Sequence, residues 1–204
     1  FSLSHSYRSS YTLNSFKSNL EFDPNNNMLT DQSGNFLNET LYTNINLVEQ
    51  FNPLIKLDME FKNSIRFLLE MKKDRALSLS LDNNLLTESA GMDYSVGFGY
   101  RVKDLKFRNN IGGRQSISSG DLNIKADINY RDNITIIRNL DILDNKVTAG
   151  QSVWSFKLSA DYALSKNFNA VFFYDHLFSE FAISTAFPQT TIRSGLTLRY
   201  NFGD

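Results

Sequence analysis

The feature that most constrains this chain is a repeated alternation of apolar and polar residues with a period of two. In one segment, Trp154, Phe156 and Leu158 alternate with Ser155 and Lys157. The clearest segments of this kind span residues 55–61, 92–100, 122–130, 154–162 and 192–202. Because successive side chains of a β-strand point to opposite faces, each segment predicts a strand with one apolar and one polar face.

Weaker segments extend the pattern along the whole chain. Besides two further clear segments at residues 65–71 and 77–81, the weaker ones span residues 1–7, 11–22, 41–48, 134–137 and 168–175. We therefore expect roughly 12 strands, and no apolar run is long enough for a transmembrane helix. The last of these segments is apolar on both faces, because Val171 and Phe173 alternate with Phe172 and Tyr174. This pattern predicts a strand that is covered on both sides.

The predicted connections are of two kinds. Tight turns are expected at residues 62–63, 73–74 and 131–133, and long polar loops at residues 23–38, 108–120 and 178–189. Short turns at one rim and long loops at the other are typical of outer-membrane barrels. We find no domain boundary, so residues 1–204 are expected to form one β-domain.

The composition gives little support to enzyme or nucleic-acid chemistry. The formal net charge is −1 and the isoelectric point is about 6.2, so no basic excess points to nucleic acid. Cys is absent, and the two histidines, His5 and His176, lie far apart in the sequence. A barrel hydrolase needs a histidine base within reach of its nucleophile, and a thiolate metal site needs cysteines. We therefore expect no catalytic residue, no cofactor and no metal ion.

The alternation alone fits both a membrane barrel and a soluble β-sandwich, because each has one apolar and one polar face. Several strands are expected to run to about 9–11 residues, the length of a tilted bilayer crossing. Aromatic residues also gather near the predicted strand ends, where girdles at the membrane interface occur. These aromatics are Phe61, Tyr100, Tyr130, Trp154, Tyr162, Phe168, Tyr174, Tyr200 and Phe202. The pattern therefore favours an all-β fold, a transmembrane antiparallel β-barrel.

Several motifs resemble one known family. They are EQFNPLI at residues 49–55, KNS at 62–64, DRALSLS at 74–80, GFGYR at 97–101 and FPQTTIRSGLTLRYNFG at 187–203. Together they resemble the SprA (Sov) family, the giant outer-membrane translocons of type 9 secretion and gliding motility. The last motif is similar to the C-terminal end of that family, and the similarity runs over most of the chain from about Leu41 onward.

The resemblance implies that the chain is an arc of a much larger barrel in the bacterial outer membrane. The largest known single-chain barrels reach about 36 strands. Phe1 already lies in an alternating segment, which also favours a piece of a longer protein. The implied function is the export of folded cargo proteins. The implied partners are the remainder of the same barrel, a PorV-type partner barrel, a periplasmic plug protein, the secreted cargo, and a lipid bilayer with lipopolysaccharide.

On this interpretation the polar face lines the lumen of the barrel. Its charged residues are Lys56, Asp58, Glu60, Lys125, Asp127, Lys157, Asp161, Arg193 and Arg199. A wall with both signs of charge offers a folded passenger no apolar surface to adhere to. Three alternatives stay open: an autonomous barrel channel for small solutes or lipids, a soluble or surface β-sandwich used for adhesion, and, with least support, an outer-membrane hydrolase.

Overall fold

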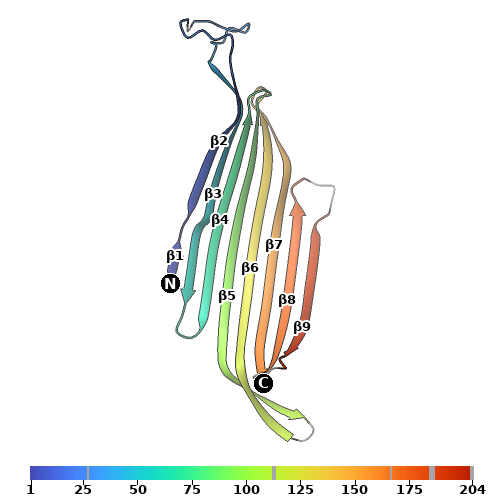
Figure 1. The fold of residues 1–204 in the computed structure, drawn as a ribbon. Helices are drawn as coiled ribbons and strands as arrows, with labels where there is room; N and C mark the ends of the chain where they lie inside the picture. The colour runs from blue at the N-terminus through green and yellow to red at the C-terminus, as the bar shows by residue number, and fades with distance from the viewer. Residues whose placement is uncertain (27, 112–113, 166, 184–186, 203–204) are drawn as a thin grey trace.

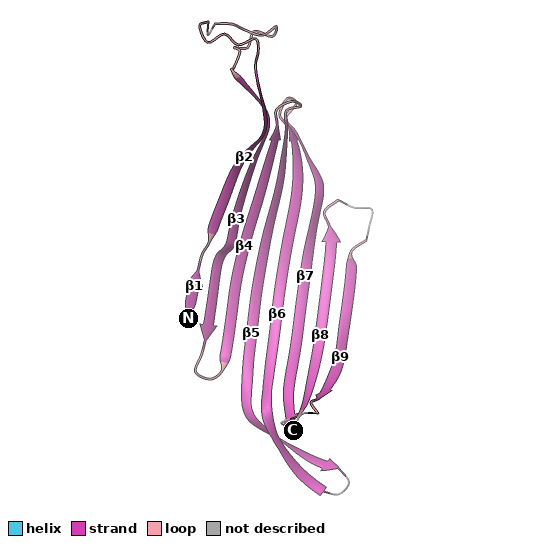
Figure 2. Ribbon diagram, viewed as in Figure 1, coloured by secondary structure: helices cyan, strands magenta, loops and turns pink. Residues whose placement is uncertain are grey.

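The computed structural model describes residues 1–26, 28–111, 114–165, 167–183 and 187–202. The described residues form one antiparallel β-sheet of nine strands and contain no helix (Figure 2). The strands are β1 (Ser2–Ser4), β2 (Tyr7–Ser18), β3 (Thr40–Glu60), β4 (Ile65–Ser80), β5 (Leu85–Ile111), β6 (Arg114–Asn139), β7 (Asp144–Ser165), β8 (Phe168–Phe181) and β9 (Gln189–Tyr200). Accordingly, no helix in this part of the chain is long and apolar enough to cross a membrane. The all-β, antiparallel part of the sequence prediction is confirmed.

From β3 to β9 each strand pairs with the next strand of the chain (Figure 1). The first two strands are different, because both pair with β3. β1 pairs with β3 near Asp58, and β2 pairs with β3 between Thr40 and Phe51. β1 and β2 therefore form one interrupted edge strand, and β9 forms the opposite edge. Among the described strands no pairing joins these two edges, so the sheet is open.

The interruption of the edge strand lies opposite an irregularity in β3. The pairing of β3 with β4 shifts register between Phe51 and Ile55, around Pro53. Pro53 has no N–H to donate to a ladder, but its carbonyl oxygen accepts a hydrogen bond from Ser6 N at 2.9 Å. His5 Nδ1 lies 2.6 Å from the carbonyl oxygen of Leu54. The segments 41–48 and 55–61, expected as separate strands, are therefore one strand with a bulge.

The expectation of roughly 12 strands is wrong, because several predicted turns lie inside long strands. Lys73 and Asp74 lie within β4, and residues 131–133 lie within β6. Asp74 pairs with Gly91 of β5, which pairs in turn with Asn133 of β6. A Cβ at Gly91 would lie 2.7 Å from Asp74 Oδ1 and 2.8 Å from Asn133 Oδ1. The glycine leaves space for both side chains, so two residue types that favour turns are accommodated in the ladder.

Two of the predicted connections are confirmed. A tight turn joins β3 to β4, where Ser64 N donates to the carbonyl oxygen of Phe61 at 3.1 Å and Ser64 has a φ of 63°. The connection between β2 and β3 contains the predicted loop 23–38. One isolated bridge, between Thr30 and Phe36, is formed within this loop.

The two other predicted loops are shorter than expected. β5 and β6 stay paired to Ile111 and Arg114, so the loop predicted at 108–120 is wrong. β8 continues to Phe181, so the connection predicted from residue 178 starts four residues later than expected, and β9 begins at Gln189. Polar side chains mark these stretches in the sequence, but strand pairing is made by backbone groups and does not require apolar side chains.

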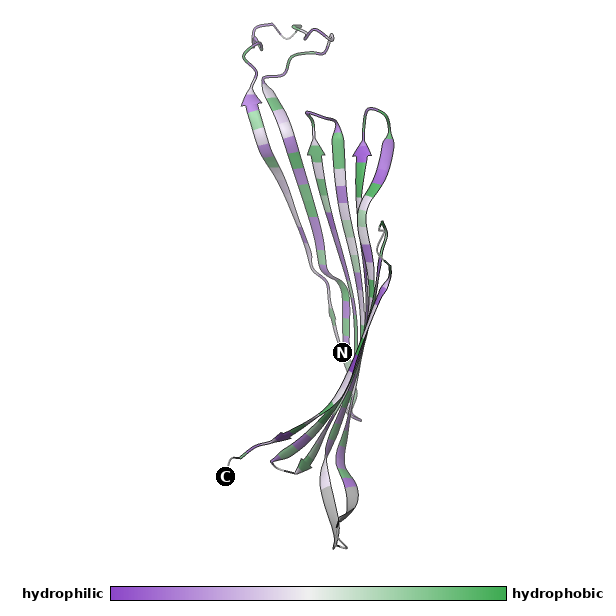
Figure 3. Cartoon of the chain, turned by 90° about the vertical axis from the view of Figure 1, so that its right-hand side faces the viewer, coloured by the Kyte–Doolittle hydropathy of each residue, from purple (hydrophilic) through white to green (hydrophobic). Residues whose placement is uncertain are grey.

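The sheet is a single layer. No hydrophobic side chain is buried among the described residues. Figure 3 shows the sheet from its side as one twisted layer, with apolar and polar residues alternating along the strands. Folded domains usually bury an apolar sheet face against a second layer, which the described residues do not supply. Whatever covers the apolar face therefore lies outside this sheet.

Candidate functional site: two opposed faces of one sheet

The register of the strands assigns each residue to one of two faces. Directly opposed residues in an antiparallel pair project to the same face, so successive pairs define rows across the sheet. One row consists of Asp58, Leu68, Gly97, Asp127, Lys157, Asp175 and Arg193. We call the side that bears this row the charged face and the opposite side the apolar face.

All the charged residues that the sequence predicted for one face lie on the charged face. Four of them share the row just described. The other five fall on the same face in neighbouring rows, since they lie an even number of residues away on the same regular strands. These are Lys56, Glu60, Lys125, Asp161 and Arg199.

Ion pairs across strands connect part of the charged face. Arg66 and Asp58 form a bidentate pair, with Nε–Oδ1 at 3.0 Å and Nη2–Oδ2 at 2.5 Å. Glu70 lies between two lysines, 3.7 Å from Lys56 Nζ and 3.3 Å from Lys72 Nζ. Further pairs are Asp93 with Arg131, Arg101 with Asp121, and Asp175 with Arg193. The sequence prediction missed several of these partners, although each follows the same alternation within its strand.

Other charges on this face have no ion-pair partner in the described part of the chain. They include Asp74 on β4 as well as Glu60, Lys125, Asp127, Lys157, Asp161 and Arg199, and most of these lie on β6, β7 and β9. The paired charges concentrate on β3, β4 and β5, with outlying pairs on β6, β8 and β9. The charged face therefore has a region in which cation and anion are free for an outside partner.

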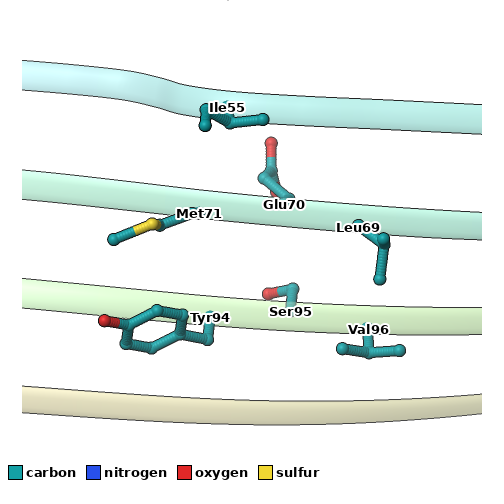
Figure 4. A pocket seen from close by; sticks show the side chains of 7 residues that line it. All are labelled: Ile55, Leu69, Glu70, Met71, Tyr94, Ser95 and Val96. Atoms are coloured by element: carbon teal, nitrogen blue, oxygen red, sulfur yellow. The ribbon is translucent and has the colours of Figure 1, made fainter. Parts of the chain in front are cut away.

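The apolar face carries a band bordered by rows of aromatic side chains. The border at one end is the row Ile55, Met71, Tyr94, Tyr130, Trp154 and Phe178. The ring centroids of Tyr94 and Tyr130 lie 6.2 Å apart, and those of Tyr130 and Trp154 lie 4.4 Å apart. Within this row the side chains of Ile55, Met71 and Tyr94, together with Leu69 and Val96 of the next row, border a shallow hollow of about 270 Å³ (Figure 4).

The border at the other end of the band is less regular. Its aromatics are Phe61, Tyr100, Tyr162, Phe168, Tyr200 and Phe202. Ring contacts join Phe168 to Tyr200 at 6.3 Å and Tyr200 to Phe202 at 4.8 Å. Tyr174, which the sequence grouped with the border aromatics, lies between the two borders because it shares a row with Leu158.

The band between the borders contains no Asp, Glu, Lys or Arg in the rows that the strand pairs define. Its large side chains are open to the surroundings: Ile128 is 44% exposed, Ile192 57% and Leu196 65%. The step from Trp154 to Tyr162 along β7 spans about 27 Å at a rise of about 3.4 Å per residue. This band of the apolar face is therefore a charge-free surface that no other described part of the chain covers.

On the side of the Trp154 border that lies away from the band, the apolar face carries charged residues. The Glu88 carboxylate accepts from Arg75 Nε at 2.7 Å and from Arg138 Nη2 at 2.6 Å, and its side chain is only 14% exposed. These hydrogen bonds, that from Arg138 foremost, lower the pKa of Glu88. Glu49 extends the network, with Oε2 at 3.9 Å from Arg75 Nη1. The apolar band thus ends sharply at this border.

The two histidines lie on different parts of the sheet, His5 between β1 and β2 and His176 on β8. His176 lies on the apolar face beside Tyr174, with ring centroids 6.4 Å apart. Asp141 Oδ1 accepts from Asn84 Nδ2 at 2.8 Å, which ties together two neighbouring turns. No group of three or more His, Cys, Asp or Glu side chains among the described residues is arranged to hold a metal ion.

Comparison of the sequence with protein-family models and with curated proteins gives no match in either set. The two faces of the sheet therefore carry the functional inference.

Proposed function

We propose that this chain is part of the wall of an outer-membrane β-barrel that conducts folded proteins across the bacterial outer membrane. The observation that carries this proposal is the exposed, charge-free apolar band on a sheet of one layer. An outer-membrane barrel has an outward apolar band about 25 Å tall between two aromatic girdles. At a strand tilt of about 40°, the length of about 27 Å along β7 corresponds to a band about 21 Å tall, which is close to that height, and the band has those borders.

A soluble sandwich explains the same face less well. Its apolar face is covered by a second sheet, and its strands are commonly about 5–6 residues long. Here β5, β6 and β7 have 27, 26 and 22 residues. They continue beyond the aromatic borders, where charged residues such as Glu88 and Arg138 appear on the formerly apolar face. A change from apolar to charged along one face fits a strand that leaves a bilayer.

The open edges support an arc of a larger barrel. β9 and the β1–β2 edge lie on opposite sides of the sheet, with the other strands between them (Figure 1). An open sheet edge is not tolerated in hydrocarbon, so each edge needs a partner strand. If the chain is part of a giant barrel, as its resemblance to the SprA (Sov) family implies, the partner strands come from the remainder of the same barrel. An autonomous small channel would instead require β9 to pair with β1 and β2.

The charged face then lines the lumen. Cations and anions lie side by side on it, so a folded passenger meets hydrated side chains of both signs instead of an adhesive apolar surface. The family resemblance supplies the rest of the proposal: the passengers are cargo proteins of type 9 secretion, a PorV-type barrel receives them, and a periplasmic plug protein closes the pore. The wall itself performs no chemistry and needs no cofactor.

The chain contains no Cys, so single cysteines can test which face meets water. Lys157→Cys and Leu158→Cys are neighbours on β7 that project to opposite faces. In outer membranes, a charged maleimide is expected to label Lys157→Cys and to leave Leu158→Cys unlabelled, whereas a lipid-soluble maleimide labels Leu158→Cys. Equal labelling of both positions by the charged reagent would contradict a membrane wall. The size of the polypeptide that carries this sequence distinguishes a large barrel from one that closes at about 23.4 kDa.

A further inference from the structure

The charged face has a hollow where two glycines of β5 follow one another on the same side. Gly97 and Gly99 form its floor together with Leu68, and Arg66, Lys125 and Asp127 stand around it. Its volume is about 230 Å³, enough for one large side chain. The hollow faces the same side as the row that contains Asp58 and Lys157.

The two glycines differ in how much free space surrounds them. A Cβ at Gly97 would lie 3.0 Å from Asp127 Oδ1 and 3.3 Å from Leu68 Cβ, so that position is crowded. A Cβ at Gly99 would have no neighbour closer than Arg66 Cβ at 3.7 Å, which is an ordinary contact. Glycine weakens a strand interior and often marks close approach of another molecule. Since packing within this chain leaves room at Gly99, the room is available to something outside the chain.

The charges around the hollow indicate which kind of molecule could occupy it. Arg66 is held by Asp58, but Lys125 and Asp127 have no ion-pair partner in the described part of the chain. A simple anion would be repelled by Asp127 and a simple cation by Lys125. A polypeptide can satisfy both, because it can present an acidic and a basic side chain on either side of a bulky one. The apolar floor at Leu68 fits the body of the bulky side chain.

We propose that the hollow is the docking site of a polypeptide segment held inside the lumen. One large side chain of the segment fills the space over Gly97 and Gly99, while an acidic and a basic neighbour pair with Lys125 and Asp127. This inference rests on the proposed function, because it takes the charged face as the lumen side. A docking hollow of this kind holds one segment in a fixed position, as a plug requires. It does not suit a cargo protein that must move through the lumen.

A photo-cross-linking amino acid can be placed beside the hollow for the test. Ser159 is suitable, because it is opposed to Lys125 in the same row. Benzoylphenylalanine at position 159 of the full-length protein is irradiated in whole cells, and the cross-linked peptide is mapped by mass spectrometry. We expect one peptide, with an acidic and a basic residue flanking a bulky residue near the cross-link.

Filling the hollow gives the decisive comparison. Gly99→Trp is expected to lower the cross-link yield about ten-fold or more, as for loss of a central anchor. Gly99→Ala fits the available space and leaves the yield unchanged, as does Ser95→Trp on the same strand and face. Lys125→Glu tests the same contact through charge if Gly99→Trp assembles poorly, and it too lowers the yield.

Two results would overturn the docking site: a spread of many different peptides, which indicates moving passengers, or a yield that Gly99→Trp and Lys125→Glu leave unchanged. Labelling of Lys157→Cys separates this failure from that of the membrane wall. If Lys157→Cys reacts with the charged maleimide and Leu158→Cys does not, the lumen is in place, and a missing cross-link counts against the docking site alone.

Discussion

The aromatic ring of Phe173 on β8 lies over Gly195 on β9. A Cβ at Gly195 would lie 2.8 Å from both Cε1 and Cζ of the ring. The two residues are directly opposed on the charged face, so the glycine supplies the space in which a large apolar side chain can lie against an otherwise polar wall. The sequence predicts that β8 is covered on both sides. On the charged face, Phe173 of this strand packs against Gly195 of the neighbouring strand.

This contact predicts a large effect of small substitutions at Gly195. Gly195→Val is expected to destabilise the folded protein by about 1–3 kcal/mol, because the ring must leave its position to avoid overlap. The urea midpoint of the purified full-length protein in detergent micelles measures the effect. Gly99→Ala, where the nearest atom is 3.7 Å away, is the matched control and should leave the midpoint nearly unchanged. A midpoint for Gly195→Val equal to that of the control would contradict the contact.

The apolar band predicts strong asymmetry between neighbouring residues of one strand. Ile128→Arg places a charge on the apolar face one row inside the Trp154 border and is expected to cost about 1–3 kcal/mol, between the cost at the bilayer midplane and that at the interface. Asn129→Arg on the opposite face should be tolerated. The equilibrium between folded and unfolded protein in lipid vesicles, read from protease protection, measures both variants. The membrane assignment of this face fails if the two substitutions have the same effect.

The charged face predicts tolerance of single charge changes and intolerance of an apolar stripe. Lys157→Glu alone should leave cargo export intact, because the hypothesis concerns the face as a whole. Combined Lys157→Leu, Ser159→Leu and Asp161→Leu on β7 should slow export and trap cargo at the wall. Export is measured as the fraction of a reporter cargo in the medium, with equal amounts of each variant in the membrane. Normal export by the triple variant would count against a bare lumen wall.

The Glu88 network predicts a pH dependence of stability outside the band. Arg138 and Arg75 hold the pKa of Glu88 below its ordinary value of 4.5. Because the folded-state pKa is the lower one, the network stabilises the folded state above the ordinary pKa, and this contribution is lost as the pH falls through the folded-state value. Glu88→Gln is expected to cost about 1 kcal/mol at neutral pH and to flatten the acid limb of the stability curve.

The measurement for this prediction is the urea midpoint between neutral pH and pH 4. Glu180→Gln is the control, since Glu180 is exposed and forms no ion pair within the described residues. An acid limb that is the same in wild type and Glu88→Gln would show that the network does not contribute.

The sequence by itself determined the all-β class and the two faces of most strands, but not the strand ends. The alternation over residues 154–162 predicts a β-strand and no other regular structure, and most strands carry their polar and apolar residues with the same period. For that reason the predicted charged residues all lie on one face, and most of the predicted aromatics lie at the borders of the apolar band.

Only the tertiary structure decided which residues meet across strands. Lys73 and Asp74 look like a turn in the sequence, yet they continue β4 because Gly91 of the next strand leaves space for Asp74. The Glu88 network joins Arg75 and Arg138 from two neighbouring strands, which only the register brings together. Periodicity depends on local backbone geometry, whereas register depends on side chains that are distant in sequence. The open edges at β9 and the β1–β2 strand likewise follow from pairing alone, because an unpaired edge carries the same alternation as a paired one.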